Sequence, residues 1–208
     1  MRLTALALLA LSLLGSSMAF AQSSRQTHDG FVASVGLGVG GGELTCGSCL
    51  RSRERAPAGY VRVGRAVGSA LVLGAELNVW SDVIGQSWLT SEPSGSQQQN
   101  RLTGRATLGT LNGVVQWYPR HATGVFLIGG VGIGQYRTHV EASTGQRFSG
   151  HSTGLGLQAG AGYDVTVTGG FSVTPYATFF STSPSAGSFG GTSVGGNALH
   201  AGVGLGWR

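Results

Sequence analysis

The sequence has no lysine and few charged residues of any kind. Its 13 cationic residues are all arginines, charged residues make up 10% of the 208 positions, and the formal net charge is +5. No dense run of arginines with interleaved aromatic residues occurs, which argues against a nucleic-acid-binding surface. Glycine is abundant instead, with 38 residues, and the mean hydropathy is +0.14. This composition is more apolar and less charged than that of an average soluble domain.

After its first residues the sequence also has no apolar run long enough for a membrane helix, which needs about 20 residues. Residues 1–21 begin with a cation, Arg2, continue through a short apolar core and end in the small-residue motif AFA. This pattern predicts a secretory signal peptide that is cleaved before Gln22. We therefore expect residues 22–208 to form one exported domain. An apolar exported chain without a spanning helix favours a transmembrane β-barrel, with a soluble β-sandwich as the alternative.

Cysteine is scarce, and Cys46 and Cys49 form a single C-x-x-C motif. A structural zinc site needs four ligands, and the sequence has no second C-x-x-C motif and no paired histidines to complete one. Export favours a disulfide between the two cysteines. We therefore predict a local disulfide in the first long connection and no metal site.

Alternating apolar and small or polar residues predict eight strands. The predicted strands are 30–40, 58–66, 70–82, 103–118, 124–138, 151–167, 170–182 and 196–208. The connections between them are alternately long and short, as in outer-membrane barrels, which have long external loops and short periplasmic turns. A soluble sandwich has no reason to sort its loops in this way.

The parity of side chains along the strands supports a barrel with an apolar outer face. In the first strand Phe31, Val35 and Leu37 share one face, and glycines occupy the other. The fourth predicted strand fits this parity least well, and either a β-bulge near Gly109 reconciles its two halves or the strand is misassigned.

These features resemble the small eight-stranded outer-membrane proteins of Gram-negative bacteria, of the OmpA transmembrane-domain and OmpX type. The resemblance includes the closing segment NALHAGVGLGWR, which is similar to the C-terminal signal read by the barrel-insertion machinery, although Arg208 follows the aromatic Trp207. It implies an all-β, eight-stranded antiparallel up-and-down transmembrane β-barrel, monomeric, in the cell outer membrane with both termini in the periplasm. Outer-membrane lipid, lipopolysaccharide and the insertion machinery would be its partners.

The first strand contains the spacing G-x-G-x-x-G at Gly36, Gly38 and Gly41. A dinucleotide fingerprint needs a helix directly after this motif, but the following segment has no helical apolar period. We therefore interpret these glycines as part of a barrel strand and expect no cofactor.

Parity directs several polar residues to the barrel interior. They are Tyr60, Arg62, Glu76, Asn78, Arg105, Gln158, Asp164, Tyr176 and His200. If the second and third strands pair around the turn AVGSA, Tyr60 lies opposite Glu76 and Arg62 is diagonal to it. An unpaired buried charge is costly, so we predict a structural pair of Arg62 and Glu76. An ion path is the alternative, although eight strands enclose just enough room for side chains. The inward glycines also suggest a small internal cavity for water or an acyl chain.

Three functions are compatible with the sequence. The preferred one is a structural or surface-interaction role without a catalytic centre, and a narrow channel is one alternative. The other is a lipid A-modifying enzyme, for which Ser149, His151 and Ser152, with Glu141 nearby, are the local candidates. Arginines in the first external loop, which can bind lipopolysaccharide phosphates, offer a further possible contact. These arginines are Arg51, Arg53 and Arg55.

Overall fold

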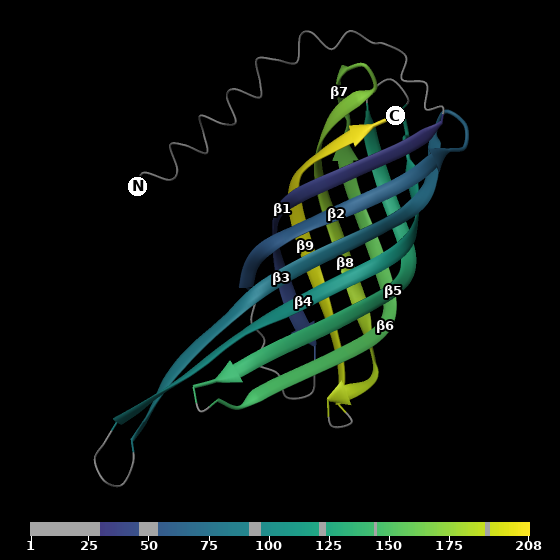
Figure 1. The fold of residues 1–208 in the computed structure, drawn as a ribbon. Coiled ribbons are helices and arrows are strands. Elements are labelled where there is room, and N and C mark those ends of the chain that lie inside the picture. The colour runs from purple at the N-terminus through teal and green to yellow at the C-terminus, as the bar shows by residue number, and fades with distance from the viewer. Residues whose placement is uncertain (1–29, 46–53, 92–96, 121–123, 144, 190–191) are drawn as a thin grey trace, which may run out of the picture.

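The computed structural model describes residues 30–45, 54–91, 97–120, 124–143, 145–189 and 192–208, which form an all-β structure (Figure 1). The strands are β1 (Phe31–Thr45), β2 (Glu54–Ala66), β3 (Leu71–Ser91), β4 (Gln97–Trp117), β5 (Val125–Ala142), β6 (Arg147–Tyr163), β7 (Val165–Thr168), β8 (Phe171–Phe189) and β9 (Thr192–Trp207). No helix long and apolar enough to cross a bilayer occurs in these ranges.

The strands form one closed barrel in which each strand pairs antiparallel with its neighbour in sequence. The first and last strands, β1 and β9, pair with each other and close the cylinder. β6 and β7 are two parts of one barrel strand, separated at Asp164, and both pair with β8. The predicted eight-stranded antiparallel up-and-down barrel is therefore confirmed.

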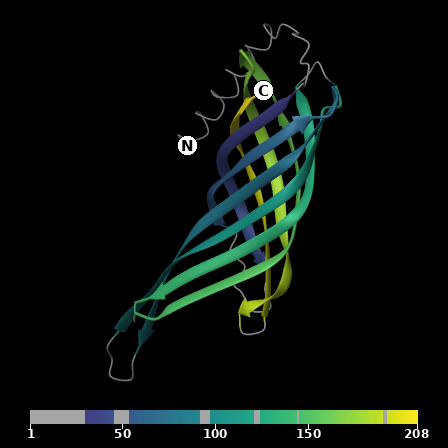
Figure 2. The same ribbon diagram turned by 45° about the vertical axis from the view of Figure 1, so that its right-hand side comes forward.

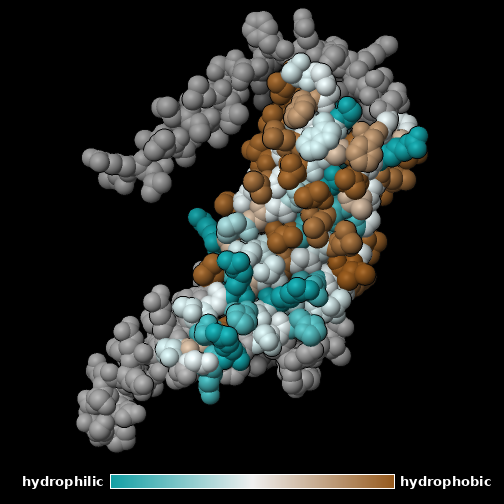
Figure 3. All heavy atoms as spheres, viewed as in Figure 1, coloured by the Kyte–Doolittle hydropathy of each residue, from teal (hydrophilic) through white to brown (hydrophobic). Residues whose placement is uncertain are grey.

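The outer surface of the barrel is apolar because alternate side chains of every strand point outward. Leu37, Ile133 and Phe31 are among the outward residues, and they are 75%, 62% and 62% exposed. On the face drawn in Figure 3 such side chains cover the part of the barrel nearer the C-terminus, where the surface is brown. Many inward positions are buried, and these include polar residues such as Arg62, Glu76 and Asn78.

Several strands run further than the sequence predicts, because they continue to pair with one another beyond the barrel. β3 and β4 remain paired as far as Ser91 and Gln97. β2 pairs with β3 only as far as Trp80, and β6 pairs with β8 only from Gly156. The ends of β3, β4, β5 and β6 thus form a sheet extension past the barrel, on the side away from the C-terminus (Figures 1 and 2).

The predicted bulge near Gly109 is wrong. β4 keeps a continuous register with both β3 and β5 through this residue. Leu108 points into the barrel and is buried, whereas Leu111 points outward and is 57% exposed. The parity of apolar residues changes along β4 because the interior itself is apolar at the end near Leu108, where this side chain packs against Trp80 and Phe180.

Candidate functional site: barrel interior and outer arginines

An ion pair between Arg62 of β2 and Glu76 of β3 lies at the centre of the barrel interior. The two residues face each other directly in the strand register, and the Arg62 Nε donates a hydrogen bond to the Glu76 carboxylate. Both side chains are buried, at 4% and 0% exposure. The diagonal arrangement predicted for them is wrong, because Tyr60 lies opposite Asn78 instead of Glu76.

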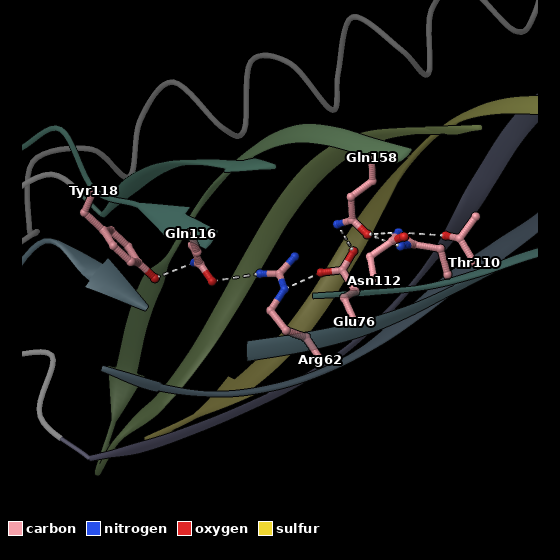
Figure 4. A network of polar contacts seen from close by, with 8 residues as sticks. Arg62, Glu76, Thr110, Asn112, Gln116, Tyr118 and Gln158 are labelled. Carbon is pink, nitrogen blue, oxygen red and sulfur yellow. Dashed lines mark hydrogen bonds and ion pairs between the residues drawn. The ribbon is translucent and has the colours of Figure 1, made fainter. Parts of the chain in front are cut away.

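Amides from β4 and β6 complete the hydrogen bonds of this pair (Figure 4). Arg62 Nη1 donates to Gln116 Oε1 at 3.1 Å, and Gln158 Nε2 donates to Glu76 Oε1 at 2.9 Å. The Gln158 Oε1 in turn accepts from Asn112 Nδ2 at 2.6 Å. Both charges therefore have partners on several strands, so the network joins opposite walls of the barrel and leaves neither charge uncompensated.

A second polar cluster closes the barrel near the C-terminus. The Asp164 carboxylate accepts hydrogen bonds from Tyr118 Oη at 2.7 Å, from Thr174 Oγ1 at 2.6 Å and from Arg208 Nη2 at 2.5 Å. Asp164 occupies the interruption between β6 and β7, where it can turn its carboxylate into the barrel mouth. The C-terminal residue, which departs from the usual aromatic ending, is thus held by an ion pair across the mouth.

Apolar layers lie on both sides of the central network. Along β3 the inward positions include Val72, Glu76, Asn78 and Trp80 in this order, so the polar residues have an apolar neighbour at each end. The layer near the C-terminus contains Val32, Val72, Val114, Tyr118, Phe126 and Ile128. The layer near the sheet extension contains Ala56, Ala58, Trp80, Ala106, Leu108, Tyr136, Phe180 and Ala198.

Aromatic rings fill the space beside some of the inward glycines. A Cβ added at Gly36 would lie 2.2 Å from Tyr60 Cε1, and one added at Gly162 would lie 2.4 Å from Phe126 Cζ. The interior cavity lined by Tyr60 and Arg62 measures about 10 Å³. Such a volume holds about one water and not an acyl chain, which contradicts an acyl-binding cavity at this place.

Arg105 points away from the interior, contrary to the sequence prediction. With no bulge in β4, its side chain lies on the outer face, where it is exposed beside His139 of β5. In the strand register Arg137 of β5 lies opposite Thr107 of β4 on one side and opposite His151 of β6 on the other. A groove of about 510 Å³ lies over these strands, lined by Arg105, Thr107, Gln135, Arg137, Thr138, His139, Ser149, Gly150 and His151.

Arg55 lies on β2 with an exposed side chain, while the rest of the predicted cysteine and arginine sites fall outside the described residues. These residues are Cys46, Cys49, Arg51 and Arg53. Among the residues that the structure does describe, no group of three or more histidine, cysteine or acidic side chains is arranged to hold a metal ion.

The local candidates for a hydrolase are divided between the two faces of β6. Ser152 is buried inside the barrel at 1% exposure, whereas Ser149 and His151 are exposed on the outside. Glu141 lies outside as well and forms an ion pair with Arg147 at 3.2 Å. His151 and Ser152 therefore cannot act on one substrate, because the barrel wall separates them.

Solved structures with a similar fold are small outer-membrane barrels. The attachment invasion locus protein (Ail) of Yersinia pestis matches with a TM-score of 0.56 and 14% identity over 85% of this chain and 99% of that chain. The structure of Ail in complex with the heparin analogue sucrose octasulfate matches with a TM-score of 0.54 and 14% identity, over 84% of this chain and 99% of that chain. Neisserial surface protein A matches with a TM-score of 0.49 and 11% identity, over 86% of this chain and 97% of that chain. No protein-family model and no curated protein matches the sequence. The chain thus has the fold of the small eight-stranded outer-membrane barrels.

Proposed function

We propose that the protein is an integral outer-membrane barrel with a structural or surface-interaction role and no catalytic centre, exported after loss of residues 1–21. The apolar belt is the observation that carries this proposal. Residues such as Leu37, Ile133 and Val203 expose 75%, 62% and 55% of their surface on all sides of the cylinder. A soluble monomer rarely exposes a contiguous apolar patch larger than about 600 Å². A bilayer covers such a belt, and closure of the barrel satisfies the backbone hydrogen bonds.

The filled interior argues against a channel. The Arg62–Glu76 network occupies the middle of the barrel, and an apolar layer packs on each side of it. The cavity beside Tyr60 and Arg62 measures about 10 Å³, which leaves no room for an ion path at this level of the barrel. We therefore assign the interior to the stability of the barrel.

The sheet extension supports a surface-interaction role. Among the described residues the ladder between β2 and β3 ends at Trp80, and the ladder between β6 and β8 begins at Gly156, with one more hydrogen bond from Leu155 N to Ser183 Oγ at 3.2 Å. Open strand edges can accept an added strand from another protein. With the termini in the periplasm, as in outer-membrane barrels generally, this extension would project outside the cell.

A lipid A-modifying enzyme is the second candidate. The observation in its favour is that Ser149, His139 and His151 line one outward groove, where they could meet the head group of a lipid. Overexpression of the protein followed by mass spectrometry of lipid A tests this candidate. A changed lipid A mass that disappears in His151→Ala would replace the non-enzymatic proposal.

Two measurements on purified protein test the main proposal. Unboiled protein should migrate differently from boiled protein on a denaturing gel, because a folded barrel resists the detergent. The same folded protein should give no unitary conductance in planar bilayers. Identical migration with and without boiling would refute the membrane barrel, and stable conductance steps would refute the filled interior.

A further inference from the structure

The outer faces of β4, β5 and β6 carry a compact group of cationic and hydrogen-bonding side chains. In the strand register Arg105 lies beside His139, and Arg137 lies beside His151. Side chains directly opposite on neighbouring strands have Cβ atoms about 5 Å apart, and diagonal ones about 7–8 Å. The two guanidinium groups and two imidazoles are therefore within reach of a single small ligand. We call these four residues, with Ser149, the arginine groove.

The arginines of the groove, Arg105 and Arg137, form no ion pair with a carboxylate of a described residue. Glu141 of β5 lies diagonal to Arg105 in the strand register, but it forms its ion pair with Arg147 at 3.2 Å. Asp82 of β3 lies opposite Ala106, which is an inward position. Like charges side by side on a sheet are unfavourable. An anion in the groove would turn this repulsion into attraction.

Towards the barrel, one intermediate row of Gly109, Gln135 and Thr153 separates the groove from a row of apolar side chains. Leu111, Ile133 and Leu155 form one row across β4, β5 and β6, and they are 57%, 62% and 52% exposed. In Figure 3 the hydrophilic surface over these strands meets the hydrophobic belt. A ligand that contacts both surfaces has an anionic head and an apolar tail. This arrangement favours a lipid over a free anion.

We propose that the arginine groove binds the phosphate group of an outer-leaflet lipopolysaccharide molecule, whose acyl chains lie on the row of Leu111, Ile133 and Leu155. The planar guanidinium groups of Arg105 and Arg137 donate paired hydrogen bonds to phosphate oxygens. The inference rests on the proposed function, since the groove meets lipid only if the belt lies in the membrane. It assigns the phosphate contact to the outer face of the sheet extension instead of the first-loop arginines.

Binding of diphosphoryl lipid A to the folded, detergent-solubilised protein tests the proposal by native mass spectrometry. The wild-type protein should bind lipid A at least about tenfold more tightly than a fully dephosphorylated lipid A, because charge-assisted hydrogen bonds are lost. The variant R105A/R137A should lose at least about tenfold in affinity for diphosphoryl lipid A. Inorganic phosphate alone should bind far more weakly than the lipid, because it lacks the acyl chains.

Two matched variants separate this site from other cationic surfaces. Arg65→Ala removes an exposed arginine of β2 at the opposite end of the barrel, and Arg55→Ala removes the predicted first-loop arginine that the structure describes. Both should bind lipid A as the wild type does. Unchanged affinity of R105A/R137A, or an equal loss in Arg55→Ala, would overturn the proposal.

Two further outcomes are decisive. Equal binding of phosphorylated and dephosphorylated lipid would show a purely apolar contact and would refute the phosphate site. Inorganic phosphate that binds as tightly as lipid A would refute the lipid. A folded, heat-modifiable barrel that fails these tests removes only the phosphate site, whereas failure to obtain such a barrel removes the proposed function as well.

Discussion

The arginine inside the barrel and the two arginines on the outer face of the sheet extension are in opposite electrostatic situations. Arg62 points inward and is neutralised by Glu76, with Gln116 as a further hydrogen-bond acceptor. Arg105 and Arg137 point outward and have no carboxylate partner among the described residues. A charge in a dry interior must be compensated by other groups of the protein, whereas a charge at the surface is solvated by water and can bind a ligand. The inner pair thus stabilises the fold, and the outer cluster is available for recognition.

The largest expected effect comes from breaking the inner pair. Arg62→Leu should lower the free energy of unfolding by about 3–5 kcal/mol, because it leaves the Glu76 carboxylate buried without its cation. The double variant R62L/E76L should lose less than the single variant. Urea titration of the heat-modifiable band in detergent measures both losses. Additive losses from Arg62→Leu and Glu76→Leu would show that the two side chains do not stabilise the barrel as a pair.

Adding a methyl group inside or outside the wall should have unequal effects. Gly36→Ala should cost about 1–3 kcal/mol, because its Cβ would collide with the buried Tyr60 ring, which packs edge-on against Tyr176. At Gly129 an added Cβ has no atom within 4 Å, so Gly129→Ala should change stability by less than about 0.5 kcal/mol. The same urea titration compares the two variants. Equal losses would mean that the interior near Tyr60 is not tightly packed.

The smallest expected change in stability is at the outer arginines. R105A/R137A should unfold within about 0.5 kcal/mol of the wild type in lipid-free detergent, because exposed side chains without an ion-pair partner contribute little. Urea titration measures this difference. A loss close to that of Arg62→Leu would show that the outer arginines are structural and would remove the contrast with the inner pair.

Local patterns in the sequence were sufficient for the fold class. The alternation in β1 and β9 identified the outward residues, such as Leu37 and Val203, because the direction of side chains in a strand repeats every two residues. The same rule failed along β4, where Ala106 and Leu108 are apolar and point inward. Their direction depends on the residues of other strands that they meet, Trp80 and Phe180 among them. With this error Arg105 was assigned to the interior.

The contact between Arg62 and Glu76 shows the same limit. The sequence identified both residues as inward and suggested their pairing, but its register was two residues off. The predicted turn was centred on Gly68, whereas the pairing of Ala66 with Val72 centres it on Ser69. A shift of one residue at the turn moves every opposite pair by two.

The sequence by itself determined the alternation, the order of the strands and the types of residue that face each way, because all three depend on neighbours along the chain. Only the tertiary structure decided which side chains meet. It brought Asp164 to Arg208 at the barrel mouth and carried β3 to β6 beyond the barrel. It also gathered Arg105, Arg137 and His151 from three strands onto one outer surface. Closure of the sheet brings Asp164 to Arg208, and the register between neighbouring strands brings the outer side chains together.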